Sequence, residues 1–70
     1  MITPEIDKLF TYHDPTEASI IYLKNVRESA KSLANVINEN IPECADKSAA
    51  IRKLRECVMT ANTAILLNQS

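Results

Sequence analysis

Three basic side chains in the first half of the sequence have the spacing of a phosphate-binding stripe. Lys24, Arg27 and Lys31 lie three and four residues apart, so on a helix they occupy one face. A guanidinium presents a planar fork of N–H donors that matches a phosphate, and Arg27 adjoins Val26 at the edge of the apolar stripe of the same helix. The pattern predicts an anion-binding site. The alternative is a solvated face whose cations pair with acids such as Glu28.

A second basic cluster lies further along the chain. Arg52 and Arg55 are three residues apart, with Lys53 between them, so the two arginines would share one face of another helix. This pair is a candidate for a further phosphate contact. Its alternative is again a solvated face, here paired with Glu56.

An aromatic residue and the chain's one histidine precede the longest predicted helix. Thr11, Tyr12 and His13 fall in a turn just ahead of a helix N-terminus, where the helix dipole favours anions. A loop tyrosine can stack on a purine base. The alternative for Tyr12 is a lid packed over the helices. His13 is a candidate ligand contact whose alternative is an ordinary surface residue.

The sequence holds no arrangement of side chains typical of catalysis. A nucleophile–base pair would need His13 beside Ser19, Cys44 or Cys57, and nothing in the spacing predicts this. One histidine and two distant cysteines also lack the close pairing of metal ligands. We therefore expect a binding protein and not an enzyme, with no metal and no cofactor. Cys57 is expected to be a small core residue.

Composition limits the class of partner. The net charge of −1 and the pI of about 5.7 argue against duplex DNA or RNA, whose binding proteins present a basic face. No stretch approaches the ~20 apolar residues of a membrane span. The first residues lack the basic region and apolar run of a signal peptide. We expect no membrane partner, and a cytoplasmic protein with reduced thiols.

Proline and capping residues divide the chain into three helices. Residues 3–5 (Thr-Pro-Glu) and 14–17 (Asp-Pro-Thr-Glu) are typical helix starts, with Asp14 as the cap of the second. Pro42 ends the long helix that follows, and the short linker after it makes the two long helices antiparallel neighbours. The prediction is an all-α protein in which residues 1–70 form a single helical-hairpin domain. Its helices cover about residues 4–10, 15–40 and 46–67.

Both long helices carry an apolar stripe wider than one partner helix can cover. Apolar residues recur every three or four positions, a period that excludes a strand. A lone hairpin would leave Ile21, Tyr22 and Leu66 in water, and a patch of this kind marks an interface. We expect a compact homo-oligomer, with a dimeric four-helix bundle as the simplest alternative.

Three segments together resemble a known family. They are residues 10–15 (FTYHDP), 26–34 (VRESAKSLA) and 54–65 (LRECVMTANTAI), with Pro42 between the second and the third. In this order they are similar to the helical-hairpin domain shared by phage anti-CBASS and anti-Thoeris sponge proteins. The resemblance covers about residues 10–66, most of the chain.

The resemblance implies a function and a principal site. It implies a hexamer that sequesters cyclic oligonucleotides without degrading them, which blocks bacterial anti-phage immune signalling in the cytoplasm of the infected host. In such proteins a loop tyrosine contacts a base and a cation of the first long helix contacts phosphate. Tyr12 and Arg27 match these positions, and Lys24, Lys31 and His13 complete the candidate ligand-binding set.

A second site, for cyclic trinucleotides, is also implied by the resemblance. It uses an arginine of the last helix, but here Thr63 stands near that position and no arginine follows Arg55. The candidate residues for this second site are Arg52, Arg55, Asn62 and Thr63. Two other classes of function fit a small helical hairpin: an RNA-binding module, and an inhibitor that covers a partner protein with one helical face.

Overall fold

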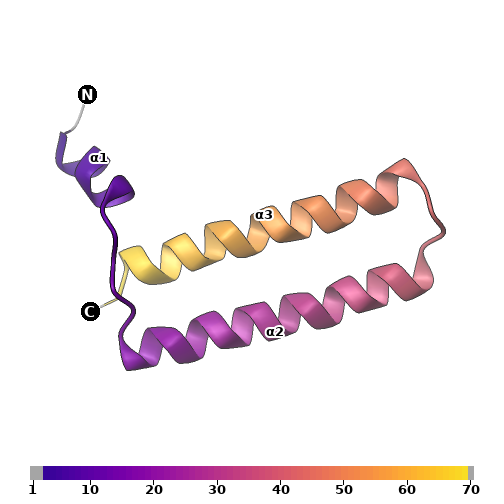
Figure 1. Ribbon diagram of the computed structural model, residues 1–70, viewed down its shortest axis with the longest axis horizontal. Coiled ribbons are helices and arrows are strands. Elements are labelled where there is room, and N and C mark those ends of the chain that lie inside the picture. The colour runs from indigo at the N-terminus through magenta and orange to yellow at the C-terminus, as the bar shows by residue number, and fades with distance from the viewer. Residues whose placement is uncertain (1–2, 70) are drawn as a thin grey trace.

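Three helices and no strand make up residues 3–69 of the computed structural model, in which side chains are described for residues 6–69. The helices are α1 (Thr3–Phe10), α2 (Glu17–Asn40) and α3 (Ala45–Leu67). α2 and α3 lie side by side and antiparallel, joined at one end by a short loop, whereas α1 leads away from the open end (Figure 1). The predicted all-α helical hairpin is confirmed.

The start of α2 is set by Thr16. Thr16 has an extended backbone, and its hydroxyl oxygen accepts a hydrogen bond from the Ser19 N–H at 3.1 Å, as expected of an N-cap residue. The prediction that Asp14 caps this helix was wrong. The physical reason is that the Ser19 hydroxyl also binds Thr16, at 2.9 Å, which favours a cap two residues later than Asp14.

The closed end of the hairpin is held by one lysine. Lys47, in the first turn of α3, is only 7% exposed. Its Nζ donates to the carbonyl oxygen of Asn38 at 3.1 Å and to Glu43 Oε1 at 2.7 Å. This one side chain therefore connects the last turn of α2, the loop and the first turn of α3. Pro42 follows Ile41, whose extended backbone ends α2, as predicted.

The protomer is a thin slab without a buried apolar core. It measures 45 × 31 × 12 Å, and its radius of gyration of 15.3 Å exceeds the roughly 11 Å of a compact chain of this length. No apolar side chain among residues 6–69 is fully buried. Ile21 and Tyr22 are 59% and 57% exposed, as predicted for a lone hairpin, while Leu66 is half-buried. Cys57, expected in a core, is exposed because a single pair of helices covers only one stripe of α3.

Candidate anion-binding site

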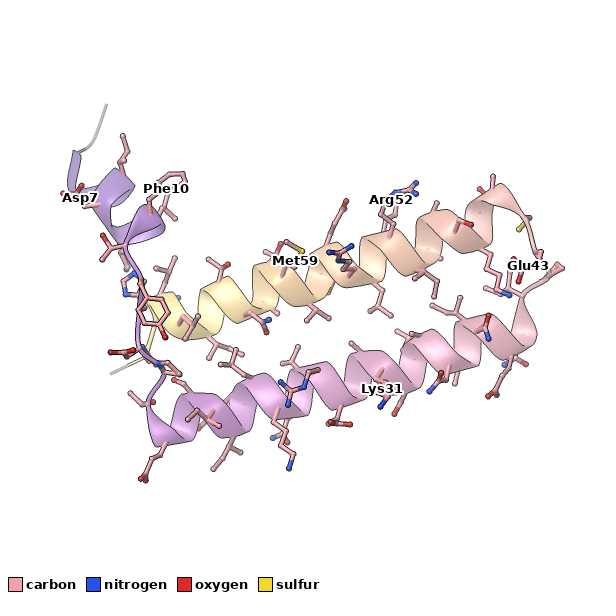
Figure 2. All side chains as sticks on the ribbon, viewed as in Figure 1. Asp7, Phe10, Lys31, Glu43, Arg52 and Met59 are labelled. Carbon is pink, nitrogen blue, oxygen red and sulfur yellow. The ribbon has the colours of Figure 1, made fainter. Side chains whose placement is uncertain are left out.

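A hollow of about 400 Å³ lies between α2 and α3, near the middle of the hairpin. Its floor consists of aliphatic side chains and Met59, and three exposed cations stand around it. Figure 2 shows Lys31 on α2 and Met59 on α3, the two helices that form this hollow. We call it the basic groove, which is lined by Arg27, Ala30, Lys31, Ala34, Ile51, Leu54, Arg55, Val58 and Met59.

The cations of the basic groove form no ion pair with an acid among residues 6–69. In the part of the chain that the structure describes, the one ion pair joins Lys47 to Glu43. Arg27, Lys31 and Arg55 therefore have no carboxylate within salt-bridge distance. The pairing with Glu28 and Glu56 that the alternative included is therefore absent among the described residues, although the three cations are solvent-exposed. Three positive charges thus line one groove without an ion-pair partner among the described residues.

A smaller hollow of about 200 Å³ lies at the open end of the hairpin. We call it the Tyr12 hollow; it is lined by Leu9, Thr11, Tyr12, His13, Thr63, Leu66 and Leu67. Tyr12 is 81% exposed, so it is not a lid packed over the helices. His13 is half-buried, and its Nε2 donates to the carbonyl oxygen of Lys8 at 2.7 Å, which ties the loop to α1. An exposed phenol ring in the lining of such a hollow can stack on a planar base.

A third hollow, of about 380 Å³, opens on the other face of the hairpin. Ser29 and Leu33 line it, and they lie two positions beyond Arg27 and Lys31, about 200° round the helix. Its remaining lining residues are Asn25, Val26, Ala30, Leu54, Cys57 and Val58. This face lacks the cations of the basic groove.

Comparison with known families decides the identity of the fold. A family model described as the Acb2/Tad1 hairpin domain matches residues 3–66. The chain belongs to this family. The resemblance to anti-CBASS and anti-Thoeris hairpins is thereby confirmed, and it extends to α1. The Acb2/Tad1 hairpin is a domain of sponge-type binding proteins and is not known as an enzyme. No curated protein and no solved structure matches the chain.

The candidate residues of this Acb2/Tad1 hairpin are grouped differently in the structure than in the prediction from the sequence. Arg55 joins Arg27 in the basic groove, and Thr63 joins Tyr12 at the open end. Tyr12 and Arg27, the matched pair of the principal site, line separate hollows of one protomer. A ligand that touches both must therefore span the two hollows or lie between protomers.

Of the remaining candidates, Lys24, Arg52 and Asn62 line neither of these two hollows, whereas Thr63 lines the Tyr12 hollow. Lys24 and Arg52 are exposed. Asn62 is half-buried, and its Oδ1 is shielded from solvent without a hydrogen-bond partner among the described residues. The Thr63 hydroxyl donates to the carbonyl oxygen of Met59 at 3.1 Å, so it is partly occupied within its own helix.

Two further chemical features of the described chain concern metals and membranes. No group of three or more histidine, cysteine, aspartate or glutamate side chains in this part could hold a metal ion. None of the described helices combines the length and the apolar character needed to cross a bilayer.

Sequence reasoning missed two residues next to the Tyr12 loop, Ser19 and Gln69. Ser19 was considered only as a nucleophile, yet it is 3% exposed and hydrogen-bonded to Thr16 and to Gln69. No local signal identifies Gln69, because its partners lie about fifty residues earlier in the chain.

Proposed function

We propose that this Acb2/Tad1 hairpin sequesters cyclic dinucleotides, and trinucleotides as a second ligand class, and releases them unmodified. By lowering the free second messenger it would block bacterial anti-phage immune signalling in the cytoplasm of the infected host. The observation that carries the proposal is the basic groove, in which three unpaired cations surround an apolar floor. Family membership supports the same assignment.

The groove and the Tyr12 hollow suit the two chemical parts of such a ligand. Cyclic oligonucleotides consist of ribose units joined in a ring by phosphodiester anions, with one base on each ribose. A shielded hydrogen bond from a cation to phosphate contributes about 1.5–3 kcal/mol, which Arg27, Lys31 and Arg55 are placed to supply. A base stacked on Tyr12 contributes about 1–3 kcal/mol. His13, fixed against Lys8, supports the loop on which Tyr12 stands.

The proposal includes assembly into a homo-oligomer, a hexamer by family resemblance. The accessible surface of the protomer is 5729 Å², whereas a compact monomer of 7.8 kDa has roughly 4,400 Å². The excess is comparable to a specific protein–protein interface. Packing of copies would convert open hollows into closed pockets, which bury most of a small ligand. Tyr12 of one protomer and Arg27 of its neighbour would then hold one ligand together.

The test is binding followed by recovery of the ligand. Purified protein is titrated calorimetrically with a panel of cyclic di- and trinucleotides, with the corresponding linear dinucleotides as controls. The saturated complex is then denatured by heat, and the released nucleotide is compared with the input by chromatography and mass. We expect a dissociation constant near nanomolar, about −12 kcal/mol, and recovery of intact ligand.

Three results would contradict the proposal. Recovery of a cleaved nucleotide would indicate an enzyme, and binding to RNA hairpins alone would indicate an RNA-binding module. Failure to bind any cyclic nucleotide would remove the sponge assignment.

A further inference from the structure

The loop that carries Tyr12 is fastened to the end of the hairpin by one side chain. Gln69 lies two residues beyond the end of α3. Its Oε1 accepts a hydrogen bond from the Thr16 backbone N–H at 3.1 Å, and its Nε2 donates to the carbonyl oxygen of Asp14 at 2.6 Å. Both ends of the carboxamide are therefore bound to the backbone of the loop, on either side of Pro15.

A buried serine completes this set of hydrogen bonds, which we call the Gln69 clasp. The Ser19 hydroxyl donates to the same Gln69 Oε1 at 2.6 Å, and it accepts from the Thr16 hydroxyl at 2.9 Å. Ser19 is 3% exposed, so its polar atoms are withdrawn from water and depend on these partners. The Thr16 hydroxyl donates to the Ser19 hydroxyl, which donates to Gln69 Oε1, so the three side chains form one continuous chain of hydrogen bonds.

These bonds decide where the loop sits relative to α3. The Tyr12 hollow combines loop residues with Leu66 and Leu67 of α3, immediately before Gln69. The partners of Gln69 lie fifty or more residues earlier in the sequence, so its hydrogen bonds join the end of α3 to the loop before α2 and to the first turn of α2. The loop residues Thr11 and Tyr12 are themselves exposed, with little packing to hold them.

We propose that Gln69 is a positioning residue for ligand binding: it holds the loop of residues 11–16 against the end of α3 and so presents Tyr12 to a base of the ligand. Gln69 does not touch the ligand. The proposal rests on the proposed function for the ligand, but the hold on the loop can be measured without one.

The experiment compares Gln69→Ala with Asn68→Ala as a matched control. Asn68 is the adjacent carboxamide, but its Nδ2 donates to the Ala64 carbonyl oxygen of its own helix, at 2.8 Å, and to no other group among the described residues. Amide hydrogen exchange at Thr16 reports the clasp directly. We expect Thr16 exchange to become roughly tenfold faster in Gln69→Ala and to stay unchanged in Asn68→Ala, as for the loss of one hydrogen bond.

Calorimetry with a cyclic dinucleotide tests the consequence for binding. We expect about tenfold weaker binding in Gln69→Ala, and no further loss when the substitution is added to Tyr12→Ala. A merely structural role of Gln69 would give the same loss in both backgrounds. Gln69→Glu keeps the acceptor for Thr16 and Ser19 but loses the donor to Asp14. It should restore Thr16 protection and part of the affinity, and it replaces Gln69→Ala if that variant loses helical content.

The outcomes separate this proposal from the proposed function. Unchanged Thr16 exchange in Gln69→Ala would overturn the positioning role, as would an affinity loss that persists undiminished in the Tyr12→Ala background. Failure of the wild-type protein to bind any cyclic nucleotide would overturn the proposed function. The exchange rate of Thr16 would still decide whether Gln69 holds the loop.

Discussion

Replacing Arg55 with alanine tests whether the basic groove is one phosphate site shared by both long helices. Arg55 is exposed, lies in the interior of α3 and has no carboxylate partner in the described protomer. The substitution therefore breaks no ion pair, and alanine is the best helix former at such a position. We expect the protomer to fold as before, so that a change in affinity reflects the ligand alone.

The expected loss of affinity follows from the surroundings of the Arg55 guanidinium. A shielded arginine–phosphate contact contributes about 1.5–3 kcal/mol, and the groove is open on one side, so the lower end applies. Arg55→Ala should then weaken binding of a cyclic dinucleotide about tenfold, and Arg27→Ala should do the same. If both forks bind one phosphate, the double variant should lose about thirtyfold and not the hundredfold of independent contacts.

Calorimetry on oligomers of matched mass at two salt concentrations is the assay. Arg52→Ala is the control, because it removes the same charge from the same helix outside the groove. Its affinity should stay within about twofold of wild type, since distant exposed charges are largely screened by salt. Equal losses in Arg52→Ala and Arg55→Ala would refute the shared groove. So would a loss in Arg55→Ala that is confined to trinucleotides, because that pattern indicates the separate second site.

Four further outcomes are expected. Tyr12→Ala should weaken ligand binding by about 1–3 kcal/mol in calorimetry, whereas Tyr12→Phe, which keeps the aromatic ring, should not; equal effects would contradict stacking at the loop. Lys47→Met should lower the free energy of unfolding by about 1–3 kcal/mol, because the Asn38 carbonyl and Glu43 lose their donor. Thermal melting at fixed protein concentration would show this loss of stability. An unchanged melting temperature would contradict the structural role of Lys47. Ala61→Glu should break up the assembly in sedimentation, since a carboxylate in a packed interface costs several kcal/mol; unchanged mass would show that this face stays free. Wild-type protein should sediment as an oligomer at micromolar concentration, and a monomer there would remove the assembly proposal.

The helices of this protein were predictable because their signals are local. Apolar residues every three or four positions, together with Pro42, define α2 and α3 without knowledge of the rest of the chain. The cap of α2 was misassigned to Asp14 because the choice between two capping side chains depends on partners. Thr16 has Ser19 and Gln69 within hydrogen-bond distance, and only one of these is near in sequence.

The candidate site was predictable only within one helix. The stripe that includes Arg27 and Lys31 follows from helical spacing, and both residues do line the basic groove. That Arg55 faces them depends on how far the antiparallel helices are shifted along each other, which periodicity does not determine. The hydrogen bonds of Gln69 could not be predicted for the same reason, because they depend on which distant segments of the chain lie together. Cys57 was wrongly predicted to be a core residue, because part of the apolar stripe on its helix is exposed to solvent in the protomer.

Three side chains between α2 and α3 belong to hollows on both faces of the slab. Ala30, Leu54 and Val58 line both the basic groove and the hollow on the opposite face, so they form a wall one side chain thick. Movement of this wall by an occupant on one side changes the shape offered on the other. Free energy coupled in this way acts equally in both directions. A nucleotide that displaces these three side chains in the groove would therefore change the free energy with which another molecule packs on the far face.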